Sequence, residues 1–353
     1  MIIITGALVL SNVSHEPEKI KIGIMTPLSG DLAFLGQNIV RSAELAIQEL
    51  GYQDKVKLII EDAGQLDKES IAAYKKLVEI DHVQIIIDGM TSDGTMSIAP
   101  LIDQDKIVMI TPLTGGENID NAAEYLFRNG PSDVLAGTKP AKEIFERGLN
   151  NVALITDNAE YTLDISKHFR KEFKGTLVYD EKIAFDTKDF RAEISKFQSK
   201  NPQAIVINTA TGNSAAYIIK QLYESENKKP IFANFIAFNA NTLEIAGESA
   251  FEGVYIYDPE FNEDSKLTKD FFMKYKEKYG NNPPIPFHTT GTYDAIKMSL
   301  EAINKGEDIH NYLLNEIQNW EGMNGKISFD EKGNTKTSFV LKQVKEGKLV
   351  RVN

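Results

Sequence analysis

The chain has 353 residues, of which 42% are apolar and 25% charged, and this is the composition of a globular protein long enough for two domains. Its net charge of −12 disfavours nucleic acid as a partner, because phosphate binding requires a basic surface. The absence of cysteine excludes disulfides, thiolate catalysis and cysteine-based zinc sites.

The chain opens with an apolar stretch, residues 1–10, followed by polar and turn-forming residues up to 19. The stretch is too short to span a bilayer, and it has no basic flank before it as a complete secretory signal would. Three interpretations stay open: a signal or anchor clipped at its start, a first strand, or a disordered start. We therefore set residues 1–19 apart from both domains.

The stretch 20–50 predicts the unit that the rest of the chain repeats. An apolar strand at 20–25 leads through a loop at 26–31 into an amphipathic helix. Further strands are expected at 56–61, 83–88 and 107–111, and helices at 67–80 and 95–102. Short strands that are apolar throughout and separated by helices indicate a parallel sheet covered on both faces.

The alternation pauses at residues 125–131 and then restarts. Strands are then expected at 152–156, 176–183, 204–208, 231–234 and 254–257, and helices at 132–147, 159–173, 189–199 and 213–224. Two successive sets of βα units predict an α/β protein with two doubly wound parallel-sheet lobes. No residue-level repeat relates the two sets.

After residue 257 the pattern changes to helices, expected at 265–279, 288–303 and 310–319. Residues 326–330 and 337–344 flank a turn and predict a terminal β-hairpin. Helices that have no sheet of their own must pack against one formed earlier, so the chain is expected to cross between the lobes more than once.

Short motifs follow one another in a consistent order from residue 20 to residue 352. The first are Ile22-Gly-Ile-Met-Thr-Pro-Leu-Ser-Gly30 and Phe34-Leu-Gly36. The later ones are Glu61-Asp62, Ile110-Thr-Pro112, DNAEY at 157–161, AGES at 246–249, TYDA at 292–295 and GKISFD at 325–330. Together they resemble the type I periplasmic binding proteins, and most closely the leucine/isoleucine/valine-binding proteins of ABC importers.

The resemblance implies two lobes joined by a three-crossover hinge, which we place near residues 128–131, 257–259 and 323–325. The expected lobe 1 comprises residues 20–130 and 259–323, and the expected lobe 2 comprises residues 131–258 and 324–353. It further implies that the lobes close on a small ligand. The ligand would then pass to an ABC permease in the membrane.

The resemblance also implies where the ligand is held. The family's contacts to an amino-acid carboxylate and ammonium fall on Ser92, the backbone of Leu113, and Gly115, and an aromatic wall from the second lobe falls on Tyr161. Two positions depart from the family pattern. Its threonine falls on Gly115, with Thr114 one residue early, and its second-lobe acid falls near Ile236.

An ammonium buried without a carboxylate partner is costly. One possibility is that Asp93, Asp157 or Glu117 replaces the missing acid. The other is that the ligand is not a typical α-amino acid but an amide or an aromatic carboxylate, which loop aromatics would suit. The complete set of candidate ligand-binding residues is Ser29, Gly30, Phe34, Thr91, Ser92, Asp93, Leu113, Thr114, Gly115, Tyr161, Phe235, Ile236 and Phe238.

Each candidate also has an ordinary structural interpretation. Ser29 and Gly30 could simply form a turn, Thr91 to Asp93 could cap the next helix, and the phenylalanines could cover a core edge. Capping and binding are compatible, because a helix N-terminus presents free N–H groups to an anion.

The sequence offers no support for catalysis. The five histidines are dispersed without a His-x-x-x-His pair, and the nucleophile-elbow, phosphate-loop and dinucleotide motifs are missing. We expect no enzyme activity, no catalytic residue, no metal site and no cofactor. The sequence predicts a monomeric extracytoplasmic solute-binding protein, in the periplasm or at the cell surface, tethered if residues 1–10 are an anchor. The alternative is a ligand-sensing receptor or regulator domain of the same fold.

Overall fold

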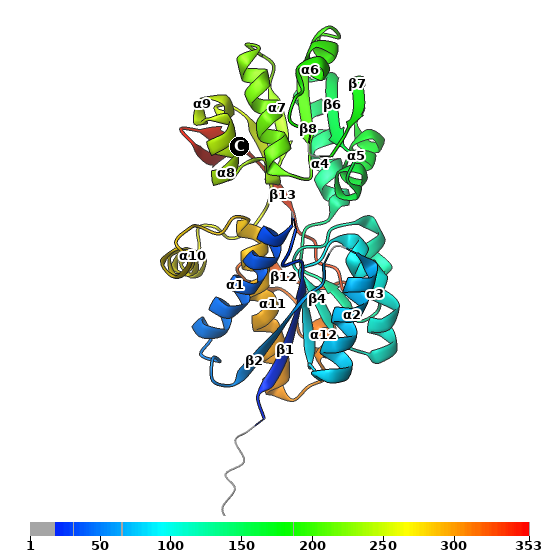
Figure 1. The fold of residues 1–353 in the computed structure, drawn as a ribbon, viewed down its shortest axis with the longest axis vertical. Coiled ribbons are helices and arrows are strands. Elements are labelled where there is room, and N and C mark those ends of the chain that lie inside the picture. Colours follow the sequence, from blue (N-terminus) through cyan, green and yellow to red (C-terminus); the bar gives the residue numbers. More distant parts are fainter. Residues whose placement is uncertain (1–17, 31, 65, 186, 353) are drawn as a thin grey trace, which may run out of the picture.

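The computed structural model describes residues 18–352 except 31, 65 and 186. The apolar start of the chain and Asp31 of the first loop therefore lie outside the described residues. The rest forms two lobes, stacked one above the other in Figure 1, each with a sheet between layers of helices. This is the predicted α/β architecture.

The first lobe is built on a parallel sheet in which β1 pairs with both β2 and β3, and β4 joins β3 to β5. Its strands in spatial order are β2 (Val56–Asp62), β1 (Ile20–Thr26), β3 (Ile85–Asp88), β4 (Met109–Thr111) and β5 (Leu126–Arg128). Its helices are α1 (Ala33–Glu49), α2 (Asp67–Lys75) with the π-helical turn η1 (Lys76–Ile80), α3 (Ser92–Asp105), η2 (Glu117–Asn121), α10 (Lys266–Tyr279), α11 (Pro286–Lys305) and α12 (Ile309–Asn315).

The late helices complete the core of this first lobe. Phe271 of α10, Ile296 of α11 and Leu313 of α12 are buried in one cluster with strand residues such as Ile24. The opposite face of the sheet is covered by α2 and α3, where Tyr74 is buried. The expectation that these helices return to an earlier sheet is therefore confirmed.

The second lobe has a mixed sheet. Its strands in spatial order are β14 (Lys348–Arg351), β13 (Phe339–Lys345), β10 (Tyr255–Pro259), β9 (Ile231–Asn234), β8 (Ala204–Asn208), β6 (Asn151–Asp157) and β7 (Thr176–Ile183). The pairs that involve β13 are antiparallel and the others are parallel. Its helices are α4 (Asp133–Glu146), α5 (Glu160–Glu172), α6 (Arg191–Gln198), α7 (Gly212–Glu224), η3 (Phe235–Ala237), α8 (Ala240–Ala246) and α9 (Glu248–Phe251).

The two lobes share one strand order. In each of them the second strand lies outside the first, and the third, fourth and fifth follow on the other side, as β2-β1-β3-β4-β5 and β7-β6-β8-β9-β10. The strand order reverses direction between β1 and β3 in one lobe and between β6 and β8 in the other. Ligands of such sheets bind outside the carboxyl ends of the strands at this reversal.

The third passage between the lobes lies later than the expected position at residues 323–325. β12 (Gly325–Ile327) pairs with β11 (Trp320–Gly322), and Ile327 and Phe329 are buried in the core of the first lobe. Asn334 still forms a bridge to Arg128 of β5. The chain therefore reaches the second lobe only between there and β13, and the expected start of the last lobe 2 segment at residue 324 is wrong.

The predicted terminal hairpin is also wrong. β12 pairs with the preceding β11, and β13 instead lies between β10 and β14. The carboxylate of Asp294 in α11 accepts hydrogen bonds from the N–H groups of Met323 and Asn324, each at 2.8 Å, and so fixes the β11–β12 turn. This partner is distant in sequence, so the local apolar pattern did not indicate it.

Candidate ligand-binding site

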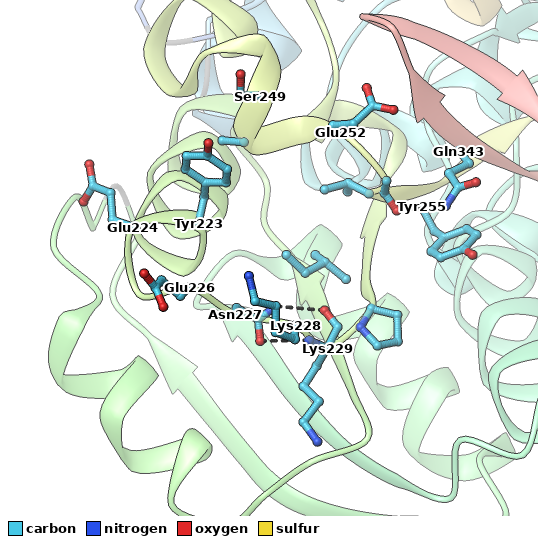
Figure 2. Close-up of a pocket in the computed structure, with 15 residues that line it drawn as sticks. Tyr223, Glu224, Glu226, Asn227, Lys228, Lys229, Ser249, Glu252, Tyr255 and Gln343 are labelled. Atoms are coloured by element: carbon cyan, nitrogen blue, oxygen red, sulfur yellow. Dashed lines mark hydrogen bonds between the residues drawn. The ribbon is translucent and has the colours of Figure 1, made fainter.

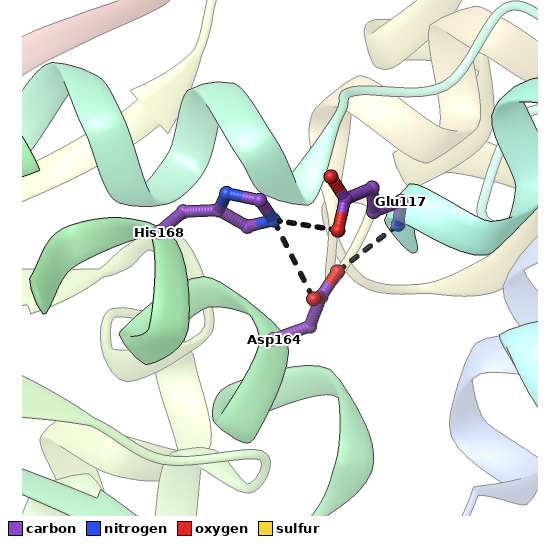
Figure 3. A group of neighbouring side chains, drawn as sticks. All are labelled: Glu117, Asp164 and His168. Atoms are coloured by element: carbon purple, nitrogen blue, oxygen red, sulfur yellow. Dashed lines mark hydrogen bonds and ion pairs between the residues drawn. The ribbon is translucent and has the colours of Figure 1, made fainter. Parts of the chain in front are cut away.

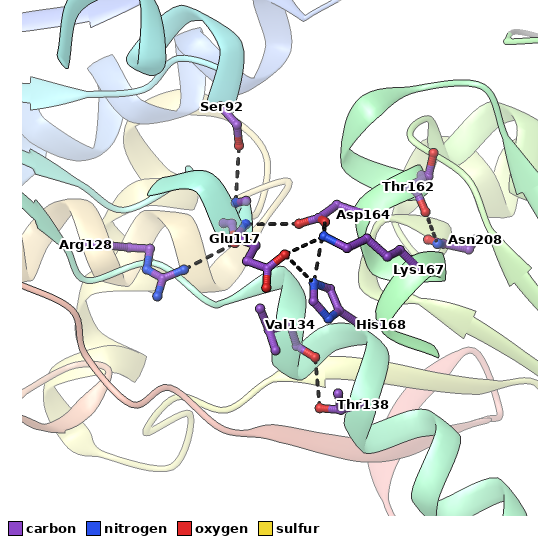
Figure 4. Close-up of polar contacts among 12 residues, drawn as sticks. Ser92, Glu117, Arg128, Val134, Thr138, Thr162, Asp164, Lys167, His168 and Asn208 are labelled. Atoms are coloured by element: carbon purple, nitrogen blue, oxygen red, sulfur yellow. Dashed lines mark hydrogen bonds and ion pairs between the residues drawn. The ribbon is translucent and has the colours of Figure 1, made fainter. Parts of the chain in front are cut away.

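The lobes enclose a cleft of about 440 Å³ that residues from both of them line. The lining residues are Ser92, Gly116, Glu117, Asn118, Asp133, Glu160, Tyr161, Leu163, Asp164 and Lys167. Figure 4 shows how the polar side chains of η2 and α5 face each other across it. The volume is in the range of about 300–1,000 Å³ found for small-molecule sites.

A buried hydrogen-bond network supports the first-lobe side of the cleft. Asp88, the last residue of β3, accepts hydrogen bonds from the Thr95 hydroxyl at 2.6 Å and from the Met90 N–H at 2.8 Å. The Thr114 hydroxyl lies 3.3 Å from the same carboxylate. Burial raises the pKa of Asp88 to about 6, against the effect of these hydrogen bonds. The network holds the loops after β3 and β4 together.

Thr114 is part of this network and does not line the cleft. Its side chain is 2% exposed, and its hydroxyl lies 2.8 Å from that of Thr111. The backbone N–H of Leu113 likewise points to the Thr111 hydroxyl, at 3.4 Å. Neither Thr114 nor Leu113 is among the residues that line the cleft.

The structure explains why position 115 is a glycine. A Cβ atom there would lie 2.4 Å from Oδ1 of Asp133 and 2.7 Å from the carbonyl oxygen of Pro131. The Gly115 carbonyl also accepts a hydrogen bond from the Asp133 N–H at 2.8 Å. The first crossover between the lobes therefore packs directly on this loop, and the family's threonine would not fit.

Ser92 begins α3 and lines the cleft, and its hydroxyl accepts a hydrogen bond from the Gly116 N–H at 3.3 Å. Thr91 is exposed and its side chain makes no capping hydrogen bond. Asp93 reaches across the cleft to Glu160 of α5. A hydrogen bond with Asp93, together with burial, raises the pKa of Glu160 to about 7.

Two of the residues that line the cleft carry a buried polar atom without a hydrogen-bond partner among the described residues, Oδ2 of Asp133 and the hydroxyl of Tyr161. Asp133 is 4% exposed. Burial and the charge of Asp164 raise its pKa well above the ordinary value, although Arg128 acts in the opposite direction. Burial raises the pKa of Tyr161, and the nearby charge of Asp133 raises it further. Because an unpaired buried polar group is costly, this pair is the clearest place for a polar ligand.

The three acids proposed as replacements for the family's second-lobe acid are all engaged elsewhere. Asp93 is hydrogen-bonded to Glu160. Glu117 forms an ion pair with Lys167. Asp157 accepts hydrogen bonds from the Thr162 hydroxyl at 2.5 Å and the Ala210 N–H at 2.7 Å.

Sequence reasoning missed Asp133, the acid whose oxygen stays free. The sequence does hold one indication of its role, because Asp133 is an acid that directly follows Pro131-Ser132 at the predicted first crossover.

The first-strand loop does not contribute to the cleft lining. Ser29 and Gly30 are exposed, and Ser29 bonds to the Asp62 carboxylate. Phe34 is 43% exposed at the start of α1. The structure therefore does not bring these three candidates together with Ser92 and Tyr161.

The aromatic loop of the second lobe lies beside the cleft. Phe235 packs edge-on against His288 of α11, with ring centroids 5.8 Å apart, and so connects the lobes. Phe238 packs against Phe251 inside the second lobe. Ile236 is half-buried, and its carbonyl accepts a hydrogen bond from Asn239. None of the three candidates lines the cleft.

A larger trough of about 880 Å³ lies entirely on the second lobe, between the end of α7, α9 and the starts of β9 and β10 (Figure 2). Asn227 and Lys229 close its wall by hydrogen bonds between the Asn227 side chain and the Lys229 backbone. This trough is at the amino ends of the strands. The ligand-binding edge of a doubly wound sheet is the opposite one, so the interlobe cleft is the better candidate.

Comparison with known proteins agrees with this fold. Residues 19–348 match the periplasmic binding protein family, and the chain belongs to that family. Its members are extracytoplasmic binding proteins. Among the helices that the structure describes, none combines the length and apolar character needed to cross a membrane.

The individual relatives include leucine/isoleucine/valine-binding proteins. The Leu/Ile/Val-binding protein of Escherichia coli (strain K12) is 24% identical over 343 residues, covering 94% of this chain and 91% of that protein. A leucine-binding protein from Thermotoga maritima has a TM-score of 0.80 at 26% identity, covering 95% of this chain and 98% of its own.

A Streptococcus pneumoniae branched-chain amino acid substrate-binding protein, in complex with isoleucine, has a TM-score of 0.84 at 25% identity, covering 94% of this chain and 98% of its own. An R. palustris solute-binding protein in complex with benzoate shares the fold, with a TM-score of 0.81 at 20% identity over 95% of both chains. The predicted type I periplasmic-binding fold is confirmed.

Proposed function

We propose that the protein is an extracytoplasmic solute-binding protein that closes its lobes on a small α-amino acid and delivers it to an ABC importer, without catalysing a reaction. The observation that carries this proposal is the free carboxyl oxygen of Asp133, buried in a cleft between two sheet edges. A ligand ammonium would satisfy it with a charge-assisted hydrogen bond.

The other end of such a ligand also finds a partner. The N-terminus of α3 presents backbone N–H groups beside the Ser92 hydroxyl, and both suit a carboxylate. Tyr161 and Leu163 supply the wall for a short side chain. This arrangement supports an amino acid over an aromatic carboxylate or an amide, because only the amino acid has both charges.

The supply of ligand to a permease fits the two-lobe architecture. Contacts from both lobes make binding favour the closed state, so ligand-loaded and empty protein differ in shape. An importer can distinguish two such shapes. The relatives in complex with isoleucine and with benzoate support a small organic molecule as the ligand.

A thermal-shift screen tests the proposal. At a ligand concentration of 100 times Kd, binding should stabilise the native state by about 2.7 kcal/mol. We expect aliphatic amino acids to raise the melting temperature of the wild type and to lose this effect in Asp133→Asn. If amides or aromatic acids act and amino acids do not, the ligand class is wrong. If no small molecule shifts the transition, the binding function is wrong.

Uptake distinguishes import from sensing. Cells that lack this protein should lose high-affinity uptake of the amino acid found in the screen, and the wild-type chain should restore it. Undiminished uptake together with a lost transcriptional response would favour the receptor function over the importer function.

A further inference from the structure

Three side chains capable of binding a metal meet at the edge of the cleft (Figure 3). Glu117 comes from η2 of the first lobe, whereas Asp164 and His168 are one turn apart on α5 of the second. Their ligand atoms all lie within 4.8 Å of one another. An i, i+4 spacing places both α5 side chains on the same face of the helix.

The distances suit a transition-metal ion. Nε2 of His168 lies 3.5 Å from Oε2 of Glu117 and 3.5 Å from Oδ1 of Asp164. Ligand bonds of roughly 2.0–2.2 Å in a tetrahedral zinc site separate neighbouring ligand atoms by about 3.3–3.5 Å. Glu117 is exposed, so its side chain can move until its oxygen lies at a similar distance from the Asp164 oxygen.

His168 is a second and independent indication of a ligand. Its side chain is 3% exposed, and its Nε2 has no hydrogen-bond partner among the described residues although it points at two carboxylates. A buried ring nitrogen that makes no hydrogen bond is costly, and the two carboxylate oxygens at 3.5 Å are too far away to supply one. A bound cation would accept its lone pair.

Lys167 currently occupies the space between the two carboxylates. Its ammonium forms ion pairs with Glu117 and Asp164 (Figure 4). The Lys167 side chain is 58% exposed, and exposed ion pairs of this kind contribute little to stability. The ammonium can therefore move into solvent when a divalent ion binds the same oxygens.

We propose that Glu117, Asp164 and His168 form a site for a divalent transition-metal ion such as Zn²⁺, which joins the two lobes. An imidazole with two carboxylates suits zinc, nickel or copper, whereas magnesium and calcium prefer oxygen ligands alone. Three protein ligands leave a fourth position for water. Because one ligand is on the first lobe and two are on the second, the ion binds only when the lobes are together.

The site adds a regulatory possibility to the cleft. An ion that holds the lobes together should increase the affinity for the organic ligand, and that ligand should increase the affinity for the ion by the same factor. This coupling rests on the proposed function, but metal binding itself does not.

Calorimetric titration of tag-free, chelator-treated protein with ZnCl₂ tests the site without any organic ligand. We expect one saturable site in the wild type, at least tenfold weaker binding in His168→Gln and in Glu117→Gln, and tighter binding in Lys167→Gln because the competing ammonium is gone. The exposed His82→Gln serves as the matched control and should bind like the wild type. CaCl₂ should give no binding.

Absence of zinc binding in both the wild type and Lys167→Gln would overturn the proposal. Unchanged affinity in Glu117→Gln would also overturn it, and this variant alters an exposed side chain that the fold does not require. The wild type could bind zinc and Glu117→Gln lose it, while neither the wild type nor any variant binds an amino acid. That result would support the metal site and contradict the proposed function.

Discussion

Gly115 and Asp133 are in direct contact where the first crossover passes the loop after β4. The glycine leaves room for the first crossover, and the crossover brings a carboxyl group into the site. The resemblance implies a threonine at position 115 and a second-lobe acid that pairs with the ligand ammonium. In this chain the Asp133 carboxylate packs directly against Gly115, one of the two positions that depart from that pattern.

Ser92 and Tyr161 allow a direct test of the site at the residue scale. Ser92→Ala removes a hydroxyl that lines the cleft, and Tyr161→Phe removes only an unpartnered hydroxyl. Each should weaken amino-acid binding by about 1–3 kcal/mol, the scale of one buried hydrogen bond, as measured by calorimetry. Tyr161→Phe should not destabilise the ligand-free protein.

The exposed Thr91→Ala is the control for these variants, because its side chain makes no capping bond. Unchanged affinity in both Ser92→Ala and Tyr161→Phe would show that the ligand binds elsewhere.

Only some of the candidate residues line the cleft, and the difference has a physical reason. The loops after β3 and the start of α5 are recognisable from local sequence, and Ser92 and Tyr161 indeed line one cleft. Thr114 and Phe238 have equally suggestive chemistry but are turned into buried networks. The orientation of a side chain in a loop depends on partners distant in sequence, and Asp133 became visible only with the crossover in place.

At the scale of elements, strands flanked by turn residues were the most predictable. The bounds of β7, β8 and β9 agree with the prediction residue for residue. β5 and β14 were missed because they are short and have little apolar pattern of their own. They are recognised as strands mainly by their pairing with β4 and β13. The terminal hairpin failed for the same reason, since the β11–β12 turn is held by α11.

The contact between Asp294 of α11 and the β11–β12 turn can be tested through its dependence on pH. Burial raises its pKa to about 7, above the ordinary value of 3.8. A raised pKa in the folded state means that the stabilisation is complete below about pH 4 and is lost as the pH rises through 7. Asp294→Asn does not titrate. Relative to the wild type it should therefore gain about 4 kcal/mol in unfolding free energy over this range, because each unit of the pKa difference corresponds to about 1.4 kcal/mol.

Urea unfolding at several pH values between 4 and 8 measures this difference. The exposed Asp54→Asn is the matched control and should follow the wild type. A constant difference between Asp294→Asn and the wild type across the range would mean that Asp294 does not titrate there.

At the scale of the whole molecule, the contact between Asp93 and Glu160 links lobe closure to pH. The pKa of Glu160 is about 7 with the lobes in contact, against an ordinary value of 4.5. The contact is therefore favoured when Glu160 is protonated and is lost as the pH rises through 7. We expect the closed population of ligand-free protein to fall between pH 6 and pH 8.

Energy transfer between dyes on the two lobes measures this population. The chain has no cysteine, so Asp54→Cys and Lys200→Cys on exposed surfaces provide unique labelling sites. Glu160→Gln should flatten the pH dependence. A profile identical to that of the parent would show that another group controls closure.

We propose that Asp133 holds the ammonium of an amino acid in the interlobe cleft. Calorimetry that compares an aliphatic amino acid with the corresponding carboxylic acid lacking the amine tests it most directly, in the wild type and in Asp133→Asn. The wild type should bind the amino acid at least tenfold more tightly than its amine-free analogue, and Asp133→Asn should lose this preference. Equal affinity of the wild type for both compounds would contradict the account.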